Sequence, residues 1–215
     1  MPSTTVLMTI AINTISIAAG LAIYYISSKL GVSERKKVIE QLTSYIINFV
    51  LFIWLAKIIW QLPLFISDPV AVLAYPSNAQ AFYLAIFLLL IQIGYHRKKR
   101  GLNIQLLLLH LIPVLLSASF TYQFIDIVWL NNQFAWGNFL LMMFLLLLFL
   151  RLRERLQQRT LIITITLCWV MGKLILSNLL PYTTMFGYMI HPLLYIIVGM
   201  ICMILFVIRR KRVSL

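Results

Sequence analysis

The chain has 215 residues, of which 62% are hydrophobic and only 11% are charged. A soluble domain of this size carries about 25% charged residues. So few charges exclude a water-exposed globular surface, and the apolar excess must face lipid. The net charge of +13 could also indicate nucleic-acid binding, so the positions of the basic residues must decide between these classes.

Seven apolar stretches are long enough to cross a membrane, since a span needs about 20 residues. Each must be helical, because backbone polar groups have no other hydrogen-bond partner in lipid. The first stretch lacks the basic segment that precedes a cleavable signal. We therefore expect one all-α integral membrane domain over residues 1–215, a bundle of seven transmembrane helices. The expected spans are residues 5–28, 42–61, 80–95, 104–124, 136–152, 160–180 and 188–208.

Lys and Arg residues follow a strict alternation along the chain. Apart from Lys57 and Lys173, all of them fall in or beside the connections after the first, third and fifth spans and in the C-terminal tail. Basic connections stay in the cytoplasm. The sequence therefore predicts an N-terminus outside and a C-terminus in the cytoplasm, in a bacterial cytoplasmic membrane. Basic residues divided among four short segments can contact anionic lipid headgroups, but they form no stripe for nucleic acid.

Lys57 and Lys173 lie inside predicted spans. A charge in mid-span costs about 2.5–3.5 kcal/mol on insertion scales, so such residues usually face the interior of a bundle and indicate function. The alternative is that each long side chain reaches past the lipid to the outer headgroups. Burial of the two ammonium groups distinguishes these interpretations.

Further polar side chains fall at the same outer level of the predicted bundle. They are Gln80, Tyr83, Tyr122, Gln123, Asp126, Asn178 and Tyr182. We expect a hydrated pocket that opens outward and holds an anionic lipid group with Lys57, Lys173, Tyr83, Tyr122, Gln123 and Asp126. Asp126 is the expected partner of a lysine, because an unpaired buried charge is costly.

No catalytic or metal motif is evident in the spacing of residues. The chain has no G-x-S-x-G, H-E-x-x-H or G-x-G-x-x-G sequence. Cys168 and Cys202 lie singly in apolar runs, and His110 and His191 have no second ligand at metal spacing. We expect packing roles for these four residues, with no metal and no cofactor.

The connections nevertheless carry an order of residues typical of one family. A basic residue and a glycine lie in the connection Lys29–Val32, and Lys57 lies at the end of the second span. Asp68–Pro69 precedes the third span, and the connection Arg97–Leu102 after that span has four basic residues and then a glycine. In the fourth span, Pro113 precedes Phe124. This order resembles the prolipoprotein diacylglyceryl transferase family, whose seven-span bacterial enzymes move diacylglycerol from phosphatidylglycerol to a lipobox cysteine. The resemblance implies a transferase-like bundle and phosphatidylglycerol or a lipoprotein as partner.

Several positions depart from the family pattern. Tyr83 stands at its His, Phe120 at its signature Arg and Gln123 at its Asn, while Lys173 and Ser177 replace a late Arg and Glu. A phenylalanine cannot bind phosphate, and a tyrosine with a pKa near 10 is a poor base at neutral pH. The first hypothesis is therefore a non-catalytic or repurposed relative that binds an anionic lipid or lipoprotein.

Two alternatives stay open. One is an active transferase in which Tyr83, Gln123 and Lys173 replace the usual groups. The other is a small transporter or channel, or a subunit that binds a membrane partner; Gly20 and Gly172 permit the close helix contacts that such packing uses.

Overall fold

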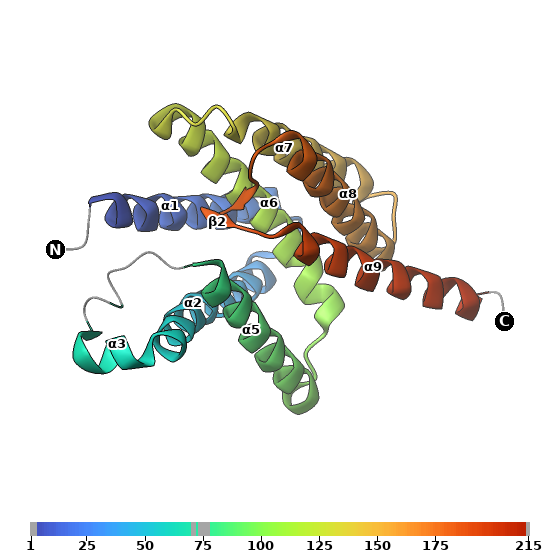
Figure 1. The fold of residues 1–215 in the computed structure, drawn as a ribbon. Helices are drawn as coiled ribbons and strands as arrows, with labels where there is room; N and C mark the ends of the chain where they lie inside the picture. The colour runs from blue at the N-terminus through green and yellow to red at the C-terminus, as the bar shows by residue number, and fades with distance from the viewer. Residues whose placement is uncertain (1–3, 70–71, 73–77, 214–215) are drawn as a thin grey trace.

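The computed structural model describes residues 4–69, 72 and 78–213 as helices joined by short connections, with one small hairpin (Figure 1). The helices are α1 (Thr4–Ser27), α2 (Val32–Trp60), α3 (Leu62–Ser67), α5 (Ala79–Arg100), α6 (Ile104–Leu130), α7 (Ala135–Leu152), α8 (Gln158–Leu179) and α9 (Pro192–Val213). The hairpin consists of β1 (Thr184–Met185) and β2 (Tyr188–Met189).

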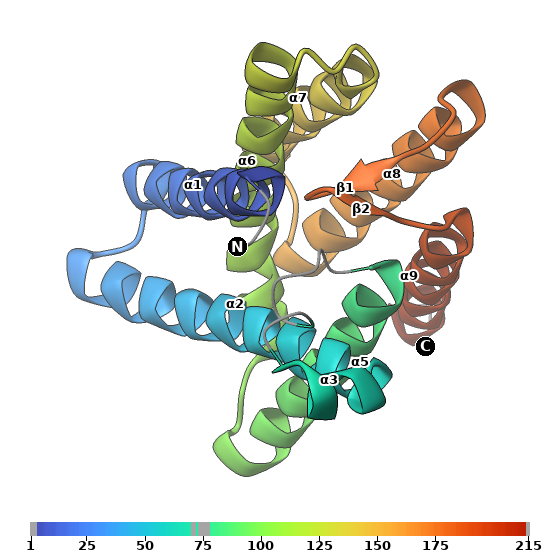
Figure 2. The same cartoon turned by 60° about the vertical axis from the view of Figure 1, so that its left-hand side comes forward.

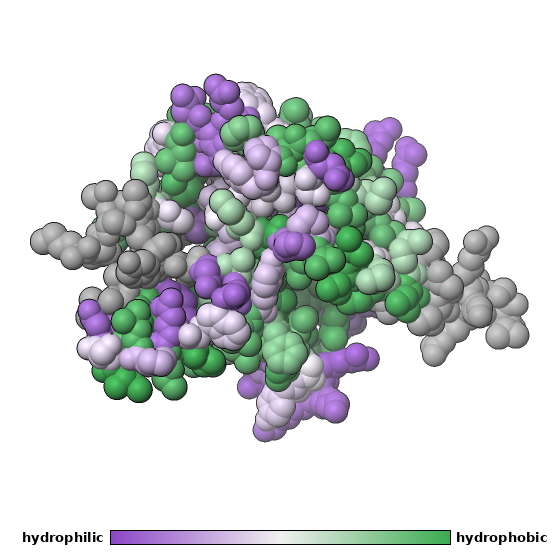
Figure 3. All heavy atoms as spheres, viewed as in Figure 1, coloured by the Kyte–Doolittle hydropathy of each residue, from purple (hydrophilic) through white to green (hydrophobic). Residues whose placement is uncertain are grey.

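Within the described residues, six helices are long and apolar enough to cross a membrane: α1, α2, α5, α6, α7 and α8. The apolar part of α9 whose side chains are described, Pro192–Ile204, is shorter. Hydrophobic side chains cover much of the outer surface over α9 and α3, whereas hydrophilic ones gather at the end of α5 (Figure 3). Large apolar side chains such as Leu90 and Leu147 are each 61% exposed, as lipid contact requires. The chain is an all-α membrane protein.

Most helices are longer than the apolar spans expected from the sequence. α2 begins at Val32 instead of residue 42, and α5 continues to Arg100 instead of ending at residue 95. Hydropathy detects only the part of a helix that lies in lipid, whereas the backbone stays helical until a capping residue ends it. Gly101 adopts φ +63 after α5, and the Asn103 side chain then accepts hydrogen bonds from the first amides of α6.

The seventh expected span is wrong at its N-terminal end. It was expected from residue 188, but Tyr188 and Met189 form β2 and the helix begins at Pro192. Proline suits the first turn of a helix, because its missing N–H would have no partner there. The preceding turn contains Phe186 at φ +53 and Gly187 at φ +84. Two consecutive positive φ values form a type I′ turn, which reverses the chain into a tight hairpin.

α2 packs against α5, and α6, α7, α8 and α9 pack against one another in order, but the most extensive contact joins two helices far apart in the sequence. α1 crosses α6, far along the chain, as Figure 2 shows. Gly20 permits this crossing, because a Cβ there would lie 2.6 Å from the Val114 carbonyl oxygen. Gly172 of α8 similarly leaves room for Leu141 of α7. Both glycines thus provide the close helix contact expected from the sequence, here within the fold itself.

Two of the basic connections meet at one end of the bundle. Arg153, after α7, donates to the Ser27 carbonyl at the end of α1 (3.3 Å), and Lys29 donates to Glu154. The hydrogen bond from Lys29 lowers the pKa of the exposed Glu154 carboxyl. The contact is therefore present above that lowered pKa and is lost as the pH falls through it. The connections after the first and fifth helical spans thus lie on the same side.

Candidate functional site

Lys173 is buried in the interior of the bundle. Its side chain on α8 is only 1% exposed. The ammonium Nζ donates to Asn138 Oδ1 of α7 at 2.6 Å and to the Thr184 carbonyl of β1 at 3.0 Å. The side chain therefore does not extend to the lipid headgroups. Of the two interpretations, the one in which the lysine faces the interior of the bundle is correct for Lys173.

Asp126, the expected partner of a lysine, does not pair with Lys173. Among the described residues, no carboxylate lies within 4.0 Å of Lys173 Nζ. Asp126 Oδ2 instead accepts a hydrogen bond from Asn132 Nδ2 at 2.9 Å. The cause is local, because Asn131 takes the left-handed conformation at the end of α6 (φ +50) and turns the chain back toward Asp126. Lys173 thus has two neutral acceptors and no anionic one.

The hairpin brings several predicted site residues together. The Thr184 carbonyl of the hairpin accepts a hydrogen bond from Lys173. Just after the hairpin, the His191 amide donates to the hydroxyl of Tyr83 of α5 at 2.8 Å. The Phe186 ring meets the Tyr122 ring of α6 edge-on at 5.8 Å. Asn13 of α1 donates to the Phe186 carbonyl at 3.4 Å. Lys173, Tyr83 and Tyr122 therefore meet around one hairpin, which is contacted by side chains from α8, α5, α6 and α1.

The turn of the hairpin is conformationally strained. A bulky residue rarely adopts positive φ, yet Phe186 has φ +53. Such conformations persist only where surrounding contacts fix them, and they gather at functional sites. Here the aromatic contact with Tyr122 and the hydrogen bond from Asn13 provide that support. Tertiary contacts therefore fix the position of this turn in spite of its unfavourable local backbone conformation.

The other predicted polar residues divide into two groups. Lys57, in the last turns of α2, is 7% exposed, and Gln123 of α6 is 3% exposed. Both are interior, and Gln123 Oε1 has no hydrogen-bond partner among the described residues. Gln80 accepts from Trp60 at the exposed surface. Asn178 donates to its own helix at Leu174, and Tyr182 packs on Phe134. These last three are not brought to Lys173.

Sequence reasoning missed two features of the site. Asn138 is the only strongly polar side chain in its apolar helix before Arg151, and this isolation was a usable signal. The hairpin was also detectable, because Phe186–Gly187 separates two short polar-apolar pairs at a spacing that fits a two-residue turn. The hairpin was hidden by treating the region near residue 188 as the start of a span.

The arrangement can bind an anion. An ammonium group has three protons to donate, and two of them face neutral oxygens. The Tyr83 and Tyr122 hydroxyls add polar groups nearby. Among the described residues, no cluster of three His, Cys, Asp or Glu side chains could hold a metal ion. The chemistry supported here is binding of a negatively charged group by hydrogen bonds.

No family model, curated protein or solved structure matches this chain. The resemblance to the transferase family therefore stays a prediction from the residue order alone.

We predict that replacing Asn138 destabilises the bundle through Lys173. Asn138→Leu removes an acceptor and should lower the free energy of unfolding by about 1–3 kcal/mol, because a buried donor loses its partner. Adding Lys173→Met should restore most of the loss, since no buried amine then needs an acceptor. Thermal unfolding in detergent measures both effects. Asn178→Leu, at a surface asparagine of α8, is the control and should change little; equal stability of Asn138→Leu and the unaltered chain would contradict the assignment.

Proposed function

We propose that the chain is a non-catalytic or repurposed relative of the prolipoprotein diacylglyceryl transferase family, which binds the anionic group of a membrane phospholipid or a lipoprotein inside its bundle. Lys173 is the main binding residue, and Lys57 provides a second buried ammonium. The observation that carries the proposal is the burial of Lys173 with two neutral acceptors and no carboxylate.

Energetics favour an anionic ligand at this position. A buried charge without a counter-charge is costly, whereas a phosphate or carboxylate on the ammonium offsets its desolvation. The Thr184 carbonyl occupies one donor of Lys173 at 3.0 Å. In the proposed complex, an anionic oxygen takes the place of that carbonyl. Such an exchange involves the strained hairpin, whose turn accepts a hydrogen bond from Asn13 and is followed by the His191 amide bonded to Tyr83.

Two local contacts support a role in binding instead of catalysis. Tyr83, at the position of the family's His, accepts the amide proton of His191 and so is committed to holding the hairpin. Phe120, at the position of the signature Arg, stacks on Phe139 with ring centres 4.7 Å apart. Neither side chain offers a base or a phosphate-binding cation.

We also propose seven spans, with α9 as the seventh, an outside N-terminus and a cytoplasmic C-terminus in a bacterial cytoplasmic membrane. In support, α1 begins and α9 ends on opposite sides of the molecule (Figure 1), as an odd number of crossings requires. The Lys29–Glu154 and Arg153–Ser27 contacts place two basic connections on one side. Basic connections favour the cytoplasmic side.

Single cysteines test this orientation. In a chain with Cys168→Ala and Cys202→Ala, we expect a membrane-impermeant maleimide to label Gln133→Cys on intact cells and to label Ser33→Cys only after lysis. Both positions are exposed. Labelling of Ser33→Cys on intact cells, with Gln133→Cys protected, would reverse the orientation and place Lys173 nearer the cytoplasm.

Retention of phospholipid tests the binding function. Native mass spectrometry of protein purified from phosphatidylglycerol-rich membranes should show bound phosphatidylglycerol, and Lys173→Met should retain one molecule fewer. Lys98→Met, which removes an exposed charge, is the control and should retain as much as the unaltered chain. Equal retention by Lys173→Met would refute binding at this lysine. If the unaltered chain restores growth to cells depleted of the transferase, the non-catalytic assignment is wrong and the active-transferase alternative holds.

A further inference from the structure

Two adjoining cavities lie at the basic end of the bundle, away from Lys173. The larger has a volume of about 350 Å³ and the smaller about 120 Å³. Small-molecule sites typically occupy about 300–1,000 Å³, so the pair together is large enough for part of a ligand. They share Gln41 of α2 and Leu102 of the connection before α6. The two cavities are therefore direct neighbours, separated by these two side chains.

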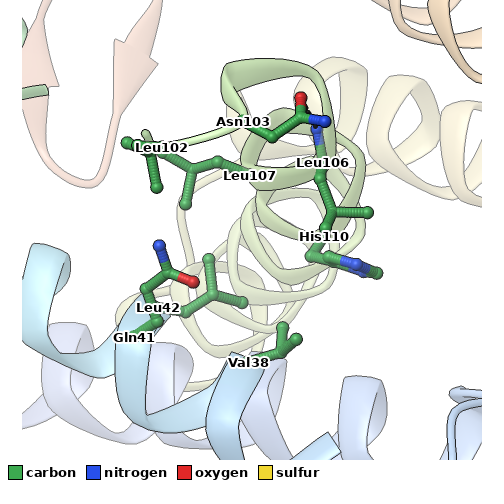
Figure 4. A pocket seen from close by; sticks show the side chains of 8 residues that line it. All are labelled: Val38, Gln41, Leu42, Leu102, Asn103, Leu106, Leu107 and His110. Carbon is green, nitrogen blue, oxygen red and sulfur yellow. Dashed lines mark hydrogen bonds between the residues drawn. The ribbon is translucent and has the colours of Figure 1, made fainter. Parts of the chain in front are cut away.

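The two cavities differ in chemistry. The smaller is mainly apolar, as Figure 4 shows; its lining residues are Val38, Gln41, Leu42, Leu102, Asn103, Leu106, Leu107 and His110. The larger has more polar side chains at its wall and is lined by Gln41, Ser44, Tyr45, His96, Arg100 and Leu102. A leucine-rich compartment beside one that offers several polar groups fits an amphipathic molecule.

The polar groups of this region suit a negatively charged headgroup. Arg100 supplies a guanidinium, whose N–H groups bind phosphate with two parallel hydrogen bonds. The Tyr45 hydroxyl lies 3.0 Å from His96 Nδ1. When this hydroxyl donates, the His96 proton is on Nε2, which is then a donor. Asn103 Oδ1 accepts from the Gln105 and Leu106 amides, which leaves its NH₂ group to donate. Among the residues that the structure describes, no Asp or Glu side chain lines either cavity.

The surroundings favour a lipid as the source of that group. Ile47 of α2 and Leu106 of α6 are 53% and 43% exposed and present apolar surface near the cavities. Arg97, Lys98 and Lys99 precede Arg100 on α5, and such basic runs concentrate anionic lipid at a membrane surface. A water-soluble phosphate would gain nothing from the leucine-lined compartment.

We propose that these cavities form a second lipid site, in which Arg100 and His96 bind the phosphate of an anionic phospholipid and an acyl segment enters the compartment around Leu42 and Leu107. This site is independent of the one proposed at Lys173. It lies among α2, α5 and the start of α6, on the side of the basic connections.

Binding of phosphatidylglycerol to protein in detergent, measured in a Lys57→Met, Lys173→Met background, tests this site alone. We expect Arg100→Gln to weaken binding about tenfold, as loss of a charged hydrogen bond implies. Lys98→Gln removes the same charge from a residue outside the cavity lining, so it should change affinity less than twofold. Ser44→Trp, which fills the rim without changing charge, should also weaken binding.

Two further probes identify the ligand class. Phosphatidylcholine should bind more weakly than phosphatidylglycerol, and inorganic phosphate should not compete at matched concentration. Equal losses in Arg100→Gln and Lys98→Gln would show general charge attraction and overturn the site. Equal binding of the two lipids would remove the anionic preference, and competition by phosphate would assign the cavity to a soluble anion. If these tests overturn the second site, the proposal of binding at Lys173 still stands, because Lys57 and Lys173 are already replaced in the protein tested.

Discussion

The ammonium group of Lys173 lies where an apolar bundle gives it no water, and the structure around it is arranged to supply acceptors. Asn138 of α7 and the Thr184 carbonyl provide them at 2.6 and 3.0 Å. In lipid, a buried charge without such partners is strongly unfavourable. Lys173 therefore fixes where α7, α8 and the hairpin sit relative to one another, and any function of the site depends on that placement.

The hairpin that accepts from Lys173 is also bound by other helices. Irregular backbone at membrane depth is tolerated only where protein or a water-filled cavity surrounds it. The Thr183–Ile190 segment is surrounded by protein contacts: it accepts from Lys173 and Asn13, and the His191 amide that follows it donates to Tyr83. The strained Phe186 is thus held by distant helices. A ligand that replaced one of these contacts would act on α1, α5 and α8 together.

The sequence predicted what depends on hydropathy and charge, namely the membrane class and the interior position of Lys173. The sequence-based prediction failed where a single hydrogen bond decides which partner a side chain has. Asp126 was assigned to a lysine because both are charged, but the turn at Asn131 gives it Asn132 instead. The span expected from residue 188 was wrong because hydropathy cannot separate an apolar strand from an apolar helix. The junction of α2, α5 and α6 depends on which helices cross, so the cavities there had no sequence signal.

Chemical modification of lysines tests the burial of Lys173 most directly. Reductive methylation of the folded protein in a bilayer mimetic, followed by peptide mass spectrometry, reports how accessible each amine is. The account predicts rapid methylation at Lys98, which is exposed, and almost none at Lys173 until the protein is unfolded. Methylation of Lys173 at the rate of Lys98 in the folded state would contradict the buried ammonium on which the site, the hairpin and the proposed function rest.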